Sequence, residues 1–168
     1  MKTIKNLALV LSLLVAVAIG ASAQTVLTSV DGIKVDVEAQ KGKVIILAVG
    51  ASWLPLSAKQ AEYTNMLVKK YAGKDVVVYF VATDSTAAKS KNFASDADIR
   101  KFAVANKLTV PVLRDSDGAV TLKKFSVDQL PSFVILNKNG ESACEPFGGI
   151  DPKYDITVPI AAAVNKLL

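Results

Sequence analysis

Few side chains in this chain could carry out covalent chemistry. The sequence contains one cysteine, Cys144, and no histidine. Without histidine, Ser-His-Asp hydrolysis, Cys-His pairs and histidine-containing metal sites are excluded. Ser57 is a candidate nucleophile only if a lysine serves as its base, and the sequence indicates no particular lysine. We therefore expect Ser57 to lie in a first helical turn, where its side chain satisfies helix amides.

The single thiol has two interpretations. Cys144 lies in a segment predicted as a strand, residues 142–147, and a free cysteine ordinarily packs there as a small hydrophobic side chain. The alternative is an intermolecular disulfide, because the chain has no second thiol for an internal one. Asp115-Ser116-Asp117-Gly118 lacks the later ligands of a calcium loop, so we expect a plain turn, no metal site and no cofactor.

The first 23 residues have the pattern of a cleaved signal peptide. Lys2 and Lys5 precede an apolar run over residues 7–19, and Ala21-Ser22-Ala23 is a small-residue cleavage site. The run is shorter than the roughly 20 residues that span a membrane, so a stable membrane anchor is not expected. The sequence predicts one domain over residues 24–168, exported to the periplasm or another extracytoplasmic compartment. A formal net charge of +5 without a long basic run gives no indication of nucleic-acid binding.

The remaining residues alternate predicted strands with predicted helices. Asp31-Gly32 predicts a tight hairpin turn, and unbroken apolar runs predict strands that are covered on both faces. Ser95 with Asp98 resembles a capping box at the start of a helix. Strands are expected at 25–30, 33–37, 44–49, 76–82, 110–113, 132–136 and 142–147, and helices at about 55–71, after Ser95, around 120–125 and near the end of the chain. This order predicts an α/β sandwich with a mixed central sheet.

One segment joins the first buried strand to the first long helix: Ala51-Ser52-Trp53-Leu54-Pro55-Leu56-Ser57. Together with its neighbours it makes the chain resemble the TlpA-like branch of the thioredoxin superfamily, which borders the AhpC/TSA group. The resemblance covers essentially all of residues 24–168. It is carried by Asp31-Gly32, Gly42-Lys43, Ala51-Ser52-Trp53, the helical insert near 95–106, Pro111-Val112-Leu113-Arg114-Asp115, Val127-Asp128-Gln129-Leu130-Pro131-Ser132-Phe133 and Asn139-Gly140.

The departures from that superfamily concern its redox apparatus. Relatives carry Trp-Cys-x-x-Cys, whereas Leu54 stands here in the attacking position and Ser57 in the resolving one. Ala48 stands where many relatives have a polar or acidic residue in the preceding strand, and the peroxidatic cysteine pattern is absent. Thiol–disulfide exchange requires a thiolate. The resemblance therefore implies a thioredoxin-like scaffold that has lost its redox chemistry.

The resemblance also implies an architecture and a binding mode. It implies a three-layer α/β/α sandwich with an N-terminal β-hairpin extension, and a cis peptide bond between Leu130 and Pro131 facing Trp53. In the superfamily an extended substrate segment pairs with the backbone beside that proline. We expect a surface that binds an extended peptide or protein, made of Trp53, Leu54, Pro55, Leu56, Leu130, Pro131, Gly148 and Gly149.

Three alternatives stay open at this point. The segment 83–94 could fold over the apolar residues Leu54 and Leu56 and cover them. Cys144 could support a residual thiol–disulfide oxidoreductase activity or a mixed disulfide with a partner. A homodimer, through the Leu54 surface or through Cys144, is a further alternative.

Overall fold

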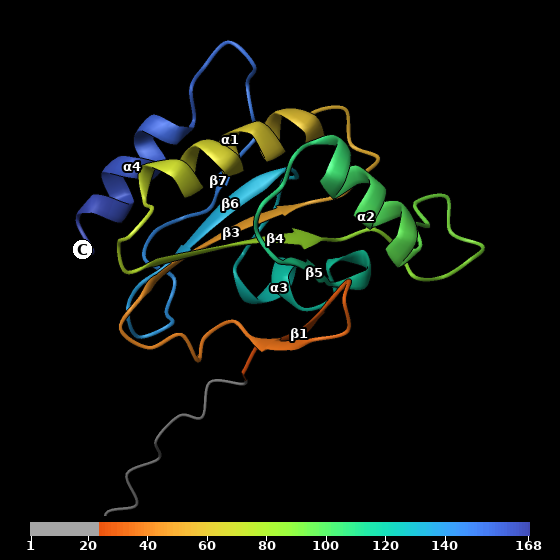
Figure 1. Ribbon diagram of the computed structural model, residues 1–168, viewed down its shortest axis with the longest axis horizontal. Coiled ribbons are helices and arrows are strands. Elements are labelled where there is room, and N and C mark those ends of the chain that lie inside the picture. The colour runs from red at the N-terminus through yellow and green to blue at the C-terminus, as the bar shows by residue number, and fades with distance from the viewer. Residues whose placement is uncertain (1–23) are drawn as a thin grey trace, which may run out of the picture.

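The computed structural model describes residues 24–168, and the predicted signal peptide, residues 1–23, lies outside the described residues. Within these residues one mixed sheet has the strand order β2-β1-β5-β4-β3-β6-β7 (Figure 1). Its strands are β1 (Val26–Ser29), β2 (Lys34–Asp36), β3 (Val44–Gly50), β4 (Val76–Ala82), β5 (Val112–Arg114), β6 (Ser132–Leu136) and β7 (Phe147–Gly148). The helices are α1 (Ser57–Lys70), α2 (Asp96–Ala105), η1 (Ser116–Gly118), α3 (Thr121–Lys124) and α4 (Thr157–Asn165).

The centre of the sheet comes from the two longest apolar runs. Every residue of β3 is buried, as expected of a strand covered on both faces. β3 pairs in parallel with β4, with Gly50 opposite Ala82, and antiparallel with β6, with Val49 opposite Ser132. Because β3 and β4 run in the same direction, the segments that follow them leave the sheet at the same edge. That edge holds the candidate site.

Helices cover both faces, as Figure 1 shows with α1 and α4 above the sheet and α3 below it. On the first face, Leu67 of α1 and Ile160 of α4 pack in one apolar cluster with Ile46 of β3. On the second face, Phe125 and Leu47 belong to a separate cluster. The structure thus confirms the expected three-layer α/β/α sandwich with an N-terminal hairpin.

The start of α2 confirms the predicted capping box. The Ser95 hydroxyl accepts from the Asp98 amide (3.2 Å), and the Asp98 carboxylate accepts from the Ser95 amide (3.2 Å). α2 packs beside β4, where the rings of Phe102 and Phe80 lie 5.7 Å apart between centroids. The insert is therefore an integral part of the fold.

The predicted strand over residues 142–147 is wrong for most of its length. Only Phe147 and Gly148 pair with β6, and Ser142 makes an isolated bridge to Leu136. Pro146 has no N–H to donate to a ladder, which favours an irregular segment between these contacts. Among the described residues, no helix is long and apolar enough to cross a membrane.

Candidate functional site

The candidate site lies where β3 leads into α1, at residues 51–57, which we call the corner. Two tight turns shape it. The Leu54 amide donates to the Ala51 carbonyl (3.2 Å), and the Ser57 amide donates to the Leu54 carbonyl (3.1 Å). α1 therefore begins at Ser57, slightly later than the sequence pattern predicts. Pro55 is compatible with this position because it has no N–H that needs a partner.

Ser57 closes the corner instead of capping the helix. Its side chain is buried, and its hydroxyl donates to the carbonyl of Ala51. The prediction that Ser57 satisfies helix amides is wrong, because Ser57 is already the first helical residue and its hydroxyl bonds back into the preceding turn. A hydroxyl whose proton is held by a backbone carbonyl, with no base bonded to it, is not arranged as a nucleophile.

The corner presents apolar surface to solvent. Trp53 is 51% exposed, Pro55 is exposed, and Leu54 is half-buried. Leu56 is also half-buried and packs against the apolar cluster on the first face of the sheet. The segment 83–94 does not cover Trp53, and nearly all of its residues from 86 to 93 are themselves exposed. The apolar patch is therefore open at Trp53, whereas Leu56 is turned partly into the core.

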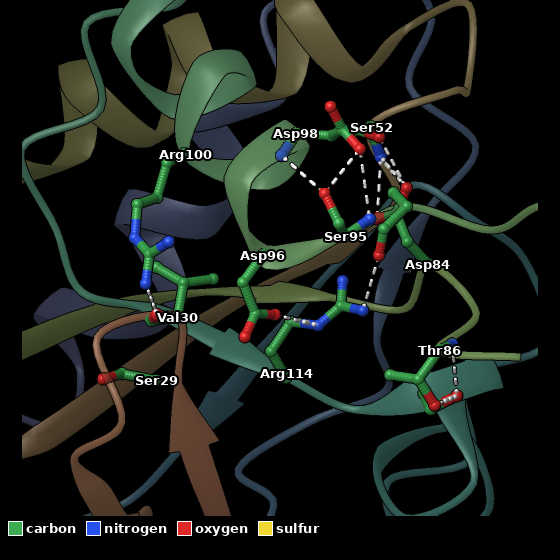
Figure 2. A network of polar contacts seen from close by, with 12 residues as sticks. Ser29, Val30, Ser52, Asp84, Thr86, Ser95, Asp96, Asp98, Arg100 and Arg114 are labelled. Carbon is green, nitrogen blue, oxygen red and sulfur yellow. Dashed lines mark hydrogen bonds and ion pairs between the residues drawn. The ribbon is translucent and has the colours of Figure 1, made fainter. Parts of the chain in front are cut away.

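A buried carboxylate anchors the corner to the end of β4. Asp84 is fully buried, and both of its oxygens lie 3.0 Å from the Ser52 amide, which donates to them. The Ser52 hydroxyl donates to the same carboxylate at 2.5 Å, and Figure 2 shows the two side chains facing each other. Thr83 adds two bonds to the Gly50 carbonyl, from its amide (2.7 Å) and its hydroxyl (3.0 Å). These bonds fix the residue that precedes Trp53.

Sequence reasoning missed Asp84, although a signal was present. An aspartate two residues after a buried strand, beside a parallel strand that leads into the corner, lies next to that corner by topology. A buried carboxylate is stable only when it is hydrogen-bonded or paired, and here the corner backbone supplies the donors.

A second missed residue, Gln60, connects the corner to β6. Its side chain is fully buried, and its Nε2 donates to the carbonyls of Val49 (3.0 Å) and Ser132 (2.9 Å). Its Oε1 has no hydrogen-bond partner among the described residues. The space is tight, because a Cβ on Gly50 would lie 2.1 Å from that oxygen. Gln60 thus holds the end of β3 and the residue after Pro131 at a fixed separation.

The peptide bond between Leu130 and Pro131 is cis, as the resemblance implied. Since Ser132 pairs with Val49, Pro131 lies beside the end of β3 that carries the corner. Pro131 itself is buried, and Leu130 packs against the cluster on the second face. Neither residue presents a large apolar side chain to solvent, and their role in binding stays a prediction.

The glycine loop adjoins this proline through β7. Gly148 pairs with Ser132, and both Gly148 and Gly149 are exposed. Gly149 has a φ of +68°, and a Cβ there would lie 2.8 Å from Oε1 of Gln129. The missing side chain therefore leaves room for Gln129, an exposed residue that sequence reasoning did not include. A partner that approaches here would meet glycine backbone and the Gln129 amide.

Cys144 lies away from the corner. The expectation that it packs as a buried small side chain is wrong, because Cys144 is exposed. Ala143 bonds to Ile135 of β6, whereas the corner end of β6 is Ser132, so the thiol lies about 10 Å farther along the sheet edge. Partial burial, and secondarily the neighbouring Glu145 carboxylate, raises the pKa of the Cys144 thiol. Both effects disfavour the nucleophilic thiolate.

The described part of the chain holds no group of three or more His, Cys, Asp or Glu side chains that could bind a metal ion. Asp115 and Asp117 are engaged in hydrogen bonds to neighbouring segments. Asp115 accepts from the amide and hydroxyl of Thr121 (2.7 and 2.6 Å), and Asp117 accepts from the Ser85 hydroxyl (3.0 Å).

Comparison with known proteins assigns the family. The profile of the Redoxin family matches residues 18–143, which is more than half of the chain. This chain belongs to the Redoxin family. The redoxin is 30% identical over 116 residues to the thiol-disulfide oxidoreductase ResA of Bacillus thuringiensis subsp. konkukian, an alignment that covers 69% of this chain and 61% of the relative. The chain thus spans less than two thirds of the length of the curated relatives that it matches.

Solved structures confirm the thioredoxin-like fold of this redoxin. A protein described as the thiol:disulfide interchange protein DsbE of Chlorobium tepidum matches with a TM-score of 0.68 and 22% identity, covering 84% of this chain and 93% of that protein. The exposed lipoprotein thioredoxin Etrx1 of Streptococcus pneumoniae matches with a TM-score of 0.64 and 27% identity, covering 83% and 99%. The redoxin has one cysteine, Cys144, which is not part of a Cys-x-x-Cys pair.

Proposed function

We propose that this redoxin is an exported, redox-inactive binding protein that holds an extended segment of a partner protein at the corner. The observation that carries the proposal is the exposed apolar side chain of Trp53 beside the half-buried Leu54, which stands where the resemblance places the attacking cysteine. A site that is exposed, apolar and rigidly supported favours recognition rather than chemistry.

The neighbouring backbone supports an extended ligand. β7 is an edge strand of only two residues, and its exposed Gly148 lies beside the cis-proline segment. An edge strand with no side chain at this position allows a partner backbone to approach closely and add as a further strand. The Ser52–Asp84 and Gln60 bonds hold the two sides of this surface in place, so little ordering is needed on binding.

The size of the apolar contribution can be worked from the exposure of Trp53. About half of a tryptophan surface of roughly 250 Å² is open, so complete coverage would remove about 125 Å² from water. At about 25 cal/mol per Å², this contributes up to about 3 kcal/mol, or about a hundredfold in affinity. Truncation of Trp53 should therefore weaken binding by ten- to a hundredfold.

Export is supported by the signal-peptide pattern of residues 1–23. It is also consistent with the exposed lipoprotein thioredoxin among the matching structures. The alternative function, thiol–disulfide exchange through Cys144, gains support from the exposure of the thiol. The raised pKa and the distance from the corner speak against it.

The test uses residues 24–168 and an array of seven-residue peptides, each with a Val-Leu-Val core. We expect measurable binding that Leu54→Asp and Trp53→Ala weaken at least tenfold. Val158→Asp is the matched control, because Val158 is an apolar side chain of α4 that is 62% exposed outside the corner. Absence of peptide binding, or an equal loss with Val158→Asp, would refute the proposal. Insulin reduction that disappears in Cys144→Ser would instead support the oxidoreductase alternative.

A further inference from the structure

A closed loop leaves the sheet beside the corner and has no role in the core. After Asp84 the chain forms a loop whose two ends lie side by side, because Ser85 and Phe93 form an isolated β-bridge. The Ser85 amide donates to the Asn92 carbonyl (2.9 Å), and the Ala94 amide donates to the Ser85 carbonyl (3.1 Å). We call residues 85–93 the side loop. It is a compact surface loop with adjacent ends, a type that is frequently functional.

The side loop and the corner are neighbours. Gly50 pairs with Ala82 at the ends of two parallel strands, and Asp84 then bonds to Ser52. Trp53 directly follows Ser52, and Ser85 directly follows Asp84. Figure 1 shows both segments at the same end of the sheet, with the side loop projecting beyond α2. The corner and the side loop therefore both begin next to the hydrogen-bonded pair Ser52 and Asp84.

The side loop carries an aromatic ring and two positive charges. Phe93 is 43% exposed, close to the exposure of Trp53, and Lys89 and Lys91 are exposed. No ion pair within residues 24–168 involves either lysine, each of which therefore keeps its charge open to a partner. The side loop itself has no exposed acidic side chain.

The acidic residues that follow the side loop are already paired. Oδ1 of Asp96 lies 3.2 Å from Nε of Arg114, whose side chain is almost completely buried (Figure 2). Oδ1 of Asp98 lies 3.4 Å from Nζ of Lys101. Asp117 also adjoins the side loop, where its carboxylate accepts from the hydroxyls of Ser85 and Ser116. Among the charged side chains of residues 85–98, those without an ion pair in the described part of the chain are therefore the two lysines, Lys89 and Lys91. A positively charged surface of this kind favours negatively charged partners and accelerates their association.

We infer that the side loop is the second half of the recognition surface and that the bound segment is acidic. An apolar side chain of the partner contacts Trp53 and Phe93, and carboxylates flanking it bind Lys89 and Lys91. This inference rests on the proposed function and specifies the chemistry of the partner. It assigns specificity to the charge of the side loop and affinity to the apolar corner.

The test compares peptides that share the Val-Leu-Val core but carry two glutamates, two glycines or two lysines at each end. We expect the acidic peptide to bind most tightly, and its binding to weaken as salt is added. The Lys89→Glu, Lys91→Glu variant should bind the acidic peptide about tenfold more weakly and prefer the basic one. Phe93→Ser should weaken binding of all three peptides.

The chain offers a matched control for the charge reversal. Lys41 and Lys43 have the same spacing and exposure, but they precede β3 at the end opposite to the corner. The Lys41→Glu, Lys43→Glu variant has the same net charge as the side-loop variant and should keep the acidic preference. Circular dichroism checks that both variants are folded.

Three other outcomes would contradict the inference, and they distinguish its failure from failure of the proposed function. Tight binding without charge preference, or equal losses in both lysine variants, would refute the role of the side loop and leave corner binding intact. If no peptide binds, the proposed function and this inference fail together. If phosphatidylglycerol vesicles bind to the side loop in place of peptides, its ligand is a membrane surface and the inference is wrong.

Discussion

Gln60 offers the sharpest test of how the corner is held together. Its side-chain amide spans two elements, because Nε2 donates to the carbonyl of Val49 on β3 and to that of Ser132 on β6. The substitution Gln60→Met keeps the length and approximate volume of the side chain but removes both hydrogen bonds. Since Gln60 is fully buried, water cannot easily replace the lost donor.

The expected cost follows from counting polar groups. Each buried carbonyl left without its partner costs about 1–3 kcal/mol, so two cost about 2–6 kcal/mol. The same substitution removes Oε1, a buried oxygen that has no partner among the described residues, and this relieves about 1–3 kcal/mol. The net expectation is a loss of about 1–3 kcal/mol in the free energy of unfolding.

Urea denaturation measures this loss, and the chain supplies its own probe. Trp53 is the single tryptophan of the sequence, so its fluorescence reports on the corner, while far-UV circular dichroism reports on the whole domain. Thr64→Val is the matched control, because Thr64 is equally buried on α1 but donates only to the Gln60 carbonyl within the helix (2.8 Å). It should cost less than about 1 kcal/mol.

Two results would refute the reasoning. If Gln60→Met unfolds at the same urea concentration as the parent with an unchanged slope, the two carbonyls have other partners and Gln60 does not hold the corner. If Thr64→Val costs as much as Gln60→Met, the loss comes from any polar deletion on α1. The specific bridge between β3 and β6 would then have no special role.

Two further predictions concern the periphery of the domain. Because burial and Glu145 raise the pKa of Cys144, alkylation by iodoacetamide should reach half its maximal rate at a higher pH than for free cysteine, and a lower midpoint would contradict this. Ser95→Ala should destabilise the domain by about 1 kcal/mol at neutral pH through loss of the α2 cap. The Ser95 hydroxyl also donates to the Asp98 carboxylate and lowers the pKa of Asp98. The part of the stability linked to that carboxylate is therefore complete above the unfolded pKa and is lost as pH falls through the folded pKa, whereas the cap bond from the Asp98 amide does not depend on pH. A difference between Ser95→Ala and the parent that persists unchanged into acid would refute that linkage.

Much of the fold is readable from the sequence because it depends on local patterns. The strands over 76–82 and 132–136 have the predicted bounds, since unbroken apolar runs between turn residues leave the backbone one favourable arrangement. The capping box at Ser95 was likewise predictable from two residues three positions apart. The segment 142–147 was not, because short exposed strands depend on what the neighbouring edge offers.

The candidate site divides in the same way. The sequence alone shows that Leu54 and Ser57 stand where the resemblance places cysteines, and that no histidine is present to support another chemistry. These conclusions need no coordinates, because the sequence alone determines whether a thiol or an imidazole is present.

Only the tertiary structure decides what surrounds these residues. Asp84 lies 32 positions from Ser52, and Ser132 lies 72 positions from Gln60, yet both pairs are hydrogen-bonded. Likewise, exposure of Trp53, burial of Pro131 and exposure of Cys144 depend on which distant segments pack against them. Residue types and spacing determine which chemistry is possible, whereas long-range packing determines which side chains meet solvent and which partners they find.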